Sequence, residues 1–422
     1  MEYIEEIQER VILVGVQLDE NDNVKESLDE LEELAKTAGA MTVGRLIQNR
    51  EMIHPGTYLG KGKLEELAFL ISETHATGII CDDELSPAQM ANMEDVLDIK
   101  VMDRTLLILD IFAARARTSE GKIQVELAQL KYRASRLAGF GRSMSRLGGG
   151  IGTRGPGETR LEMDRRRIRR RMSDLRREID DLSGQRNLRR AKREKNKVPV
   201  VALVGYTNAG KSTLLNQLTG AAIPANNRLF DTLDTTSRLL TVSDTLDVVI
   251  SDTVGFIRKL PHQLVEAFKA TLEELEYADL LLHVIDASNP EWQEQARIVD
   301  ELIRGLGAET IPCIRVYNKS DLAFAFQRDK EGDAVNVSAK TGEGLDRLLS
   351  AIDKKLDKGT KRVTLHLPYD KAGALDSLYR EAKVESVEYG ETVDVVAVCT
   401  PRIIGQLKNY IEGWTVPKEE WE

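Results

Sequence analysis

Short apolar runs alternate with longer amphipathic segments over about the first 115 residues of the chain. An apolar run of roughly four to eight residues is typical of a buried strand, whereas apolar residues at helical spacing indicate a helix that covers a sheet. The alternation therefore predicts a parallel α/β domain over residues 1–115. The expected strands are 11–16, 42–47 and 78–81, and the expected helices are 25–38, 64–72 and 88–97.

Two long amphipathic segments follow. Apolar residues recur at spacings of four and three from Ile123 to Leu137, and every seven residues from Leu161 to Leu182. Seams of this kind suit each other in a pair of packed helices. The connecting residues, 139–157, include eight glycines. Residues 116–197 are thus predicted to form an antiparallel helical hairpin with a long flexible tip.

The second half of the chain returns to an alternation of strands and helices. Apolar runs end at Val204, Ile250, Tyr317 and Val337, and a polar turn follows each of them. This pattern predicts a second α/β domain over residues 198–359, with its ligand at the carboxyl edge of the sheet. Residues 360–422 contain segments that read as strand, helix, strand and helix, which predicts a small α+β domain.

The turn after Val204 carries the most specific chemistry. Residues 205–212 fit the phosphate-loop pattern GxxxxGK[ST], between an apolar strand and a segment of helical spacing. Backbone N–H groups at such a helix start bind phosphate oxygens. Lys211 is expected to reach the β- and γ-phosphates, and Ser212 is expected to hold Mg²⁺. The residues assigned to the nucleotide here are Gly205, Tyr206, Thr207, Asn208, Ala209, Gly210, Lys211, Ser212 and Thr213.

Three further polar segments complete a guanine-nucleotide site. An Asp at a strand end can hold Mg²⁺ through water, and a glycine three residues later can meet the γ-phosphate with its N–H. The carboxylate of Asp321 can accept hydrogen bonds from the N1–H and 2-amino groups of guanine, which adenine does not present in that arrangement. The sequence therefore predicts GTP. The assigned residues are Asp252, Thr253, Val254 and Gly255; Asn318, Lys319, Ser320 and Asp321; and Ser338, Ala339 and Lys340.

A polar segment before Asp252 is expected to close over the triphosphate. One of its threonines should bind Mg²⁺ when the γ-phosphate is present, and we favour Thr232, with Thr236 as the alternative. The expected catalytic set is Lys211, Ser212, Thr232 and Gly255, with Ser212 and Thr232 as metal ligands. The segment adds Phe230, Asp231, Thr232, Leu233 and Asp234 to the nucleotide site.

The two residues after Gly255 are apolar. Phe256 and Ile257 occupy the place where Ras-like enzymes have the glutamine that positions water, so intrinsic hydrolysis is expected to be slow. Asn208 has two interpretations. It helps to bind a monovalent cation, K⁺, where an arginine finger otherwise stands, or it only braces the phosphate loop.

Composition narrows the cellular compartment in which the protein is expected to act. No apolar run approaches the roughly 18–20 residues that span a bilayer, and the acidic N-terminus is unlike a signal peptide. Cys81, Cys313 and Cys399 lack the spacing of metal ligands and are expected to be reduced thiols. These features predict a cytoplasmic protein.

The net charge of −10 hides a strongly basic segment. Residues 141–197 contain 19 Lys or Arg and 8 Asp or Glu, a net of +11, so the rest of the chain carries −21. A one-signed, self-repelling helix needs a polyanion. Because residues 139–197 contain a single aromatic residue, Phe140, we expect recognition of structured RNA by shape and backbone rather than by stacking. The residues assigned to RNA are Arg142, Arg146, Arg154, Arg165, Arg166, Arg169 and Arg170.

Three segments carry a resemblance to a known family: residues 115–130, 155–159 (Gly-Pro-Gly-Glu-Thr) and 252–268. With them the chain resembles the HflX family of bacterial-type GTPases, in the Obg–HflX superfamily. The resemblance implies a GTPase that binds the large ribosomal subunit and separates 70S ribosomes, with the glycine-rich tip near the peptidyl-transferase region. Ser212 and Thr232 match the Mg²⁺ ligands of the family, whereas Thr235 stands where its pattern usually has Pro.

Two other functions remain open at this point. The same motifs suit a GTPase of large-subunit assembly, and the GTP site alone would suit a signalling switch that acts on a protein effector. The basic hairpin argues against the signalling switch. The partners expected from the family are GTP and GDP, the 50S subunit, the 70S ribosome and rRNA, with a monomeric chain away from the ribosome.

Overall fold

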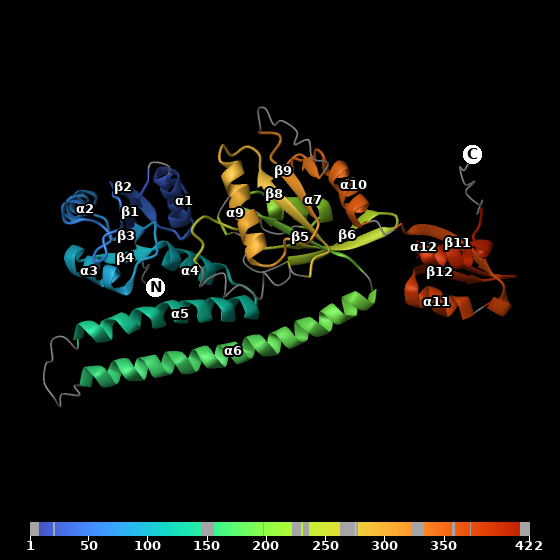
Figure 1. Ribbon diagram of the computed structural model, residues 1–422, viewed down its shortest axis with the longest axis horizontal. Coiled ribbons are helices and arrows are strands. Elements are labelled where there is room, and N and C mark those ends of the chain that lie inside the picture. The colour runs from blue at the N-terminus through green and yellow to red at the C-terminus, as the bar shows by residue number, and fades with distance from the viewer. Residues whose placement is uncertain are drawn as a thin grey trace, which may run out of the picture.

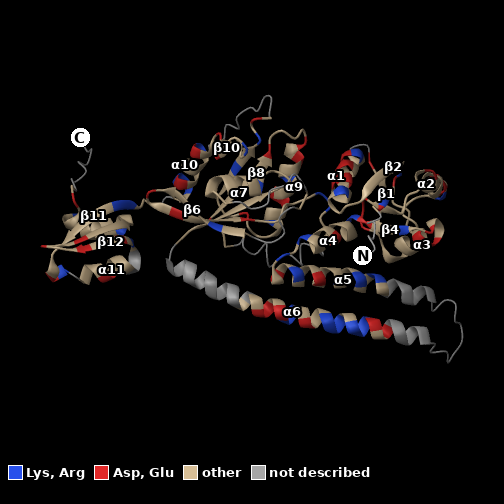
Figure 2. Ribbon diagram, turned by 180° about the vertical axis from the view of Figure 1, so that it is seen from behind, with Lys and Arg blue, Asp and Glu red and all other residues tan. Residues whose placement is uncertain are grey.

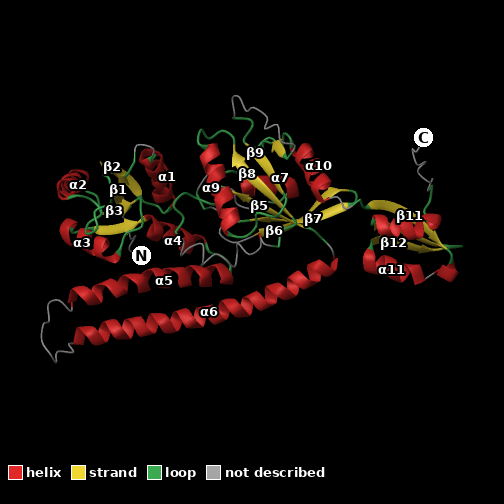
Figure 3. Ribbon diagram, in the orientation of Figure 1, coloured by secondary structure: helices red, strands yellow, loops and turns green. Residues whose placement is uncertain are grey.

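The computed structural model consists of three sheet-containing domains and a long helical hairpin, which lies alongside the first two domains (Figure 1). Each domain combines strands with helices (Figure 3). The structure describes residues 8–19, 22–144, 156–196, 198–221, 229–230, 236–261, 275, 277–322, 333–356, 359–371 and 373–413. For residues 138–144, 156–161, 183, 185–196 and 380–381 it describes the backbone alone.

The N-terminal domain is a parallel sheet with helices on both faces. Its elements are β1 (Arg10–Gln17), α1 (Val24–Thr37), β2 (Met41–Asn49), α2 (Lys61–Thr74), β3 (Gly78–Cys81), α3 (Pro87–Leu97), β4 (Lys100–Asp103) and α4 (Arg104–Arg115). The strand order is β2-β1-β3-β4. Because side chains alternate along a strand, Leu13 packs on the side of α1 and α4, and Val14 on the side of α2 and α3. The parallel α/β fold that the sequence predicts is confirmed.

The sequence pattern does not single out β4 or α4. Strand β4 is only four residues long, and α4 is apolar over most of its circumference. The structure explains this composition, since α4 lies between its own sheet and the next domain. Leu107, Ile111 and Phe112 are all buried there. Asp103 caps the start of this helix, and its side chain accepts a hydrogen bond from the Leu106 N–H at 2.9 Å.

The hairpin consists of α5 (Ser119–Met144) and α6 (Pro156–Asn196), which run side by side (Figure 1). Leu127 of α5 and Leu175 of α6 are buried, as the expected seam requires. Helix α5 has a second apolar face that the sequence reading missed. Its residues Val125, Ala128 and Tyr132 pack in the same core as α1 and α4, so this face fixes the hairpin to the N-terminal domain.

The central domain has a six-stranded sheet of order β10-β9-β8-β5-β7-β6, in which only the edge strand β6 is antiparallel. Its elements are β5 (Val200–Gly205), α7 (Lys211–Thr219), β6 (Thr236–Ser243), β7 (Leu246–Asp252), β8 (Leu280–Asp286), α9 (Trp292–Gly305), β9 (Cys313–Asn318), β10 (Ala334–Asn336) and α10 (Leu345–Leu356). Helices α7 and α10 cover one face, and α9 covers the other. Parallel strands therefore bring the ends of β5, β7, β9 and β10 to one edge.

The C-terminal domain is an antiparallel sheet of order β11-β13-β12 with helices on one side. Its elements are β11 (Lys361–Leu367), η1 (Tyr369–Lys371), α11 (Gly373–Glu381), β12 (Lys383–Tyr389), β13 (Val393–Cys399), α12 (Pro401–Leu407) and η2 (Lys408–Tyr410). The α+β class is as predicted, but the sequence reading counted one strand too few. Lys383 pairs with Asp247 of β7 and so connects this domain to the central one.

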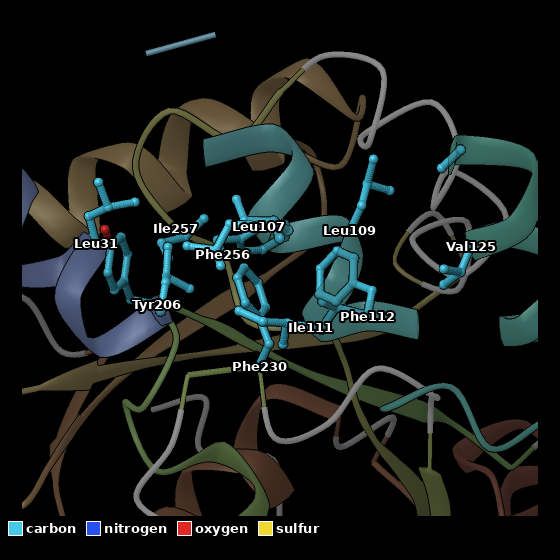
Figure 4. Packing of buried hydrophobic residues seen from close by; sticks show 14 of the residues in the cluster. Leu31, Leu107, Leu109, Ile111, Phe112, Val125, Tyr206, Phe230, Phe256 and Ile257 are labelled. Atoms are coloured by element: carbon cyan, nitrogen blue, oxygen red, sulfur yellow. The ribbon is translucent and has the colours of Figure 1, made fainter. Parts of the chain in front are cut away.

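A continuous hydrophobic core joins the N-terminal domain, α5 and the central domain. Figure 4 shows Leu107, Ile111 and Phe112 of α4 beside Phe230 and Phe256 of the central domain. The rings of Phe112 and Phe230 meet edge to face, with centroids 4.7 Å apart. The central domain and the N-terminal domain thus share one hydrophobic core.

Replacing Phe112 with Ala should lower the free energy of unfolding by about 3–5 kcal/mol, because the change removes a buried ring and leaves a cavity. Urea denaturation of the full chain, followed by circular dichroism, measures this loss. Phe69→Ala on α2 is the matched control, since that ring is 67% exposed. Similar losses for both variants would contradict a core shared by the two domains.

Candidate functional site

The loop between β5 and α7 is shaped by two glycines. Gly210 has a φ of +92°, and a Cβ there would lie 2.2 Å from Asn318 Nδ2. A Cβ at Gly205 would lie 2.3 Å from the carbonyl oxygen of Val284. The backbone therefore needs glycine at both positions. It turns tightly into α7, whose first N–H groups face the carboxyl edge of the sheet.

The side chain of Lys211 lies inside this loop. Its Nζ donates hydrogen bonds to the carbonyl oxygens of Gly205 (3.1 Å) and Tyr206 (2.8 Å). Burial lowers the pKa of Lys211 to about 8, although the nearby Asp252 acts to raise it. A buried ammonium with mainly neutral partners favours an anion beside it. Phosphate oxygens would supply that charge, which agrees with the role expected for Lys211.

Ser212 and Asp252 lie together at the start of α7 and the end of β7. The Ser212 hydroxyl donates a hydrogen bond to Asp252 Oδ2 at 2.6 Å. A hydroxyl and a carboxylate are hard oxygen donors of the kind that Mg²⁺ prefers, so this pair fits the expected metal. Among the described residues, no three His, Cys, Asp or Glu side chains form a metal-binding group. A magnesium site of this class relies on phosphate oxygens, a hydroxyl and water instead.

The structure describes only part of the polar segment before Asp252 that is expected to close over the triphosphate. Thr232, with Asp231, Leu233 and Asp234, lies outside the described residues. Thr236, the alternative metal ligand, begins β6 and is paired in register with Asp252. The backbone thus brings Thr236 to the edge of the sheet where Ser212 and Asp252 meet.

The base-recognition segments are tied to each other and to the phosphate loop. Asn318 donates from Nδ2 to the carbonyl oxygen of Ala209 at 2.8 Å, and its Oδ1 accepts from the Ala339 N–H at 2.9 Å. Ser338 donates from Oγ to Asp321 Oδ1 at 2.7 Å. These bonds fix the Asp321 carboxylate beside the loop of Ala339, as a guanine site requires.

Asp286 is a functional candidate that the sequence reading missed. It ends β8 and accepts a hydrogen bond from Lys319 Nζ at 2.6 Å. Lys319 has a φ of +60°, so its backbone is in the left-handed region, and the ion pair holds its side chain in place. In the sequence, the mainly apolar run Leu280–Ile285 is followed by the acidic residue Asp286. This resembles the run that ends at Ile250, shortly before Asp252.

Gly255 lies directly against the phosphate loop. A Cβ there would be 2.8 Å from Thr207 Cγ2 and 3.0 Å from Lys211 Nζ. The next residue bridges to the same loop: Phe256 donates its N–H to the Gly205 carbonyl (3.1 Å), and its own carbonyl accepts from the Thr207 N–H (2.7 Å). Gly255 is thus positioned beside the residues that are expected to bind the phosphates.

Phe256 and Ile257 are at most 2% exposed, and their side chains lie in the core shared with the N-terminal domain (Figure 4). This packing explains why apolar residues stand where a water-positioning glutamine is found in Ras-like enzymes. Phe256 and Ile257 thus form part of the contact between the central and N-terminal domains.

Two side chains assigned to the nucleotide face elsewhere. Phe230 is buried against Phe112, so its ring belongs to the core between the domains. The hydroxyl of Tyr206 donates to Glu30 of α1 and accepts from the Arg258 N–H at 2.8 Å. Burial raises the pKa of Tyr206, and the neighbouring Glu30 raises it further. Tyr206 and Phe230 therefore contribute side chains to domain contact, and only their backbones lie near the site.

The basic face of the hairpin is exposed. Figure 2 shows Lys and Arg concentrated in the first half of α6 and mixed with acidic residues farther along. Two arginines serve the hairpin itself: Arg165 donates to the Leu137 carbonyl at 2.6 Å, and Arg171 pairs with Glu126 at 2.7 Å. The exposed ones are Arg166, Arg167, Arg169 and Arg170. The side chains of Arg142, Arg146 and Arg154 lie outside the described residues.

Across the described ranges, none of the helices combines the length and apolar character that crossing a membrane requires.

Four family models match the chain: "GTP-binding GTPase N-terminal" over residues 25–113, "GTP-binding GTPase Middle Region" over 115–193, "50S ribosome-binding GTPase" over 200–319 and "HflX C-terminal domain" over 323–400. A crystal structure of a GTP-binding protein from Sulfolobus solfataricus in complex with GDP is 24% identical, covers 82% of this chain and 98% of that chain, and has a TM-score of 0.43.

Two curated relatives match most of the chain. The GTPase HflX of Lacrimispora saccharolytica is 55% identical over 391 residues, which are 92% of this chain and 92% of the relative. The GTPase HflX of Escherichia coli is 43% identical over 383 residues, which are 89% of this chain and 90% of the relative. The phosphate loop, the guanine-recognition segments and these matches agree, and the chain belongs to the HflX family of GTPases.

Proposed function

We propose that this GTPase binds the large ribosomal subunit, contacts rRNA through its hairpin and uses GTP to separate 70S ribosomes. The observation that carries the proposal is the row of exposed arginines on α6, in a chain whose central domain has a nucleotide site and matches the ribosome-binding GTPase family. Arginines at Arg166, Arg169 and Arg170 can each contact a backbone phosphate without reading the base. A ribosome offers such phosphates on a structured RNA surface.

In the proposed site, the residues of the chain hold the nucleotide at three points. Asp321 reads guanine, Lys211 stabilises the negative charge of the β- and γ-phosphates, and the Gly255 N–H meets the γ-phosphate. Ser212 and Thr232, with Asp252 behind them, are the proposed holders of Mg²⁺, which would neutralise charge that develops on the transferred phosphoryl group. Hydrolysis transfers this group from GTP to water, with GDP as the leaving group.

The attacking water has no glutamine from the position after Gly255 to orient it, because Phe256 and Ile257 are buried between the domains. We therefore propose that the chain alone turns over slowly and that the ribosome completes the site. K⁺ near Asn208 is a second proposed contributor. The left-handed backbone of Asn208, with a φ of +61°, is compatible with a bracing role as well.

We propose that the protein acts in the cytoplasm, where it would meet ribosomes, and that it is a monomer when it is off the ribosome. Four exposed arginines lie within residues 166–170 of the hairpin, and the glycine-rich segment joins its two helices. We propose that α6 docks and that the segment between α5 and α6 separates the subunits.

Nucleotide choice should depend on Asp321. In Asp321→Asn, an amide donor faces the guanine donors, so GTP affinity should fall by about tenfold or more while xanthine nucleotides gain. The amide oxygen can still accept from Ser338, which preserves the loop. Equilibrium binding of GTP and XTP measures the change, with Asp346→Asn on the exposed start of α10 as the control. A variant that still prefers GTP would show that Asp321 does not read the base.

Turnover should be slow for the chain alone and rise when large subunits are added, because the site lacks a water-positioning side chain. Phosphate release measured with and without subunits tests this, and equal rates would rule out activation by the ribosome. Repeating the assay in KCl and NaCl tests Asn208, for which the absence of K⁺ stimulation would leave the bracing role.

Changes in helix α6 and changes in the segment between α5 and α6 should impair different steps. Charge reversal at Arg166, Arg169 and Arg170 should lose ribosome binding first, since phosphate contacts provide affinity that weakens steeply with salt. Deletion of residues 144–154 should lower affinity only modestly but abolish splitting. Pelleting with ribosomes and light scattering of 70S particles separate binding from splitting.

A suitable control is Arg297→Glu on α9, because Arg297 is exposed and pairs only within its own helix among the described residues. If the tip deletion splits ribosomes at the normal rate, the hairpin is only an anchor. If the protein binds 50S subunits but never splits 70S ribosomes, the assembly role is favoured instead.

A further inference from the structure

Strand β8 ends in an acidic residue beside the segment that is expected to read the base. Asp286 and Asn318 are register partners on the parallel strands β8 and β9, so both lie at the carboxyl edge of the sheet. Asp286 Oδ2 accepts a hydrogen bond from Lys319 Nζ at 2.6 Å. Lys319 directly follows Asn318 and lies two residues before Asp321, the proposed reader of guanine. The ion pair therefore connects the end of β8 to the middle of the base-recognition segment.

The carboxylate of Asp286 is itself held in a fixed orientation. Its Oδ1 accepts hydrogen bonds from the Ser288 N–H at 3.0 Å and from the Ser288 hydroxyl at 2.6 Å. The Ala287 N–H donates to the Asn318 carbonyl at 3.0 Å, which ties this turn to the end of β9. One carboxylate oxygen of Asp286 thus shapes the turn after β8, and the other oxygen binds Lys319.

Lys319 needs a partner to keep one conformation. Its backbone lies in the left-handed region, with a φ of +60°, which is uncommon for a residue that has a side chain. A lysine side chain also has considerable rotamer entropy, so an ammonium that bonds only to water leaves its four-carbon stem free to move. The ion pair with Asp286 holds the ammonium at the end of β8 and thereby fixes the course of the stem.

A fixed lysine stem suits the face of a purine ring. Asp321 can contact only the edge of guanine, where the N1–H and 2-amino groups lie, so other groups have to cover the ring faces. Asn318 and Asp321, on either side of Lys319 in the sequence, are both anchored by hydrogen bonds to neighbouring loops. Within this segment, the methylene groups of Lys319 are the apolar surface that can cover a ring face while the charged end stays bound elsewhere.

We propose that Asp286 is a positioning residue for nucleotide binding, which holds Lys319 by its ammonium so that the lysine stem covers one face of guanine. The proposal rests on the proposed base site, in which Asp321 reads the edge of the ring. Because the base takes no part in hydrolysis, contact with it is equally strong before and during the reaction. Asp286 therefore contributes to the affinity for GTP and GDP alike and not to the rate of the chemical step.

The test measures equilibrium binding of GDP and of a non-hydrolysable GTP analogue to the full chain without ribosomes. Asp286→Ala should lower both affinities by about tenfold, because it removes a charge-assisted hydrogen bond and frees the lysine side chain. Asp286→Asn keeps the shape and a neutral acceptor, so it should give a smaller loss of about threefold. In steady-state hydrolysis of GTP, both variants should raise KM while kcat stays within about twofold.

A double-mutant cycle separates positioning from a general effect on the loop. Lys319→Met keeps an apolar stem and removes the ammonium that Asp286 holds, so adding Asp286→Ala to Lys319→Met should cause little further loss of affinity. The matched control is Asp333→Ala, which breaks another Asp–Lys pair of the central domain, between Asp333 and Lys355 (2.8 Å). Asp333 directly precedes β10, at the edge of the sheet opposite the nucleotide site, and its loss should leave both affinities unchanged.

Three results would overturn the proposal: unchanged affinities in Asp286→Ala, a lower kcat with an unchanged KM, or additive losses in the double-mutant cycle. If Asp286→Ala fails to fold, the isosteric Asp286→Asn decides the matter by the same criteria.

Failure of the base site itself is distinguishable by the ratio of GTP affinity to XTP affinity. Variants of Asp286 should keep the wild-type ratio, since Asp321 still reads the edge of the ring, whereas Asp321→Asn should change it. A wild type that binds GTP and XTP equally would disprove the role of Asp321, and the double-mutant cycle would still show whether Asp286 acts through Lys319.

Discussion

A buried guanidinium holds the two halves of this GTPase together. Arg104 is 1% exposed and bonds to Asp82 and Glu30 of its own domain and to the Arg258 carbonyl of the central domain. Its partners raise its pKa against the effect of burial. Taking away one partner of a buried charge typically costs about 3–5 kcal/mol, so the surrounding elements must keep their positions. The aromatic core of Phe112 and Phe230 lies in the same interface and excludes water from it.

The residue before Arg104 faces the other way and holds the hairpin. Asp103 accepts hydrogen bonds from the Tyr132 hydroxyl at 2.9 Å and from Arg136 at 2.7 Å, both on α5. The dipeptide Asp103–Arg104, at the junction of β4 and α4, thus touches the loop after Gly255 on one side and helix α5 of the hairpin on the other. This is a continuous chain of contacts from the proposed γ-phosphate site to α5. Coupling between the two sites would pass through these residues.

The sequence predicted those features that are set by local chemistry. The phosphate loop, the Asp321 segment and the hairpin seam each depend on residue types at a fixed spacing, and the structure brings the first two together through Asn318. Two side chains assigned to the nucleotide site have contacts of a different origin. Tyr206 and Phe230 lie in segments that also serve the nucleotide, but their partners, Glu30 and Phe112, are more than a hundred residues away. No spacing rule within the chain links such positions.

A contact between residues that are far apart in the sequence also accounts for the apolar residues Phe256 and Ile257. In the sequence alone, Phe256 and Ile257 indicate only that a glutamine is absent. In the fold, their side chains pack in a core that the central domain shares with the N-terminal domain. One side chain at this position cannot both orient a water molecule in the site and pack in a core between domains. The family member described here uses the position for packing. The contact between the domains therefore decides which residue types can stand directly after Gly255.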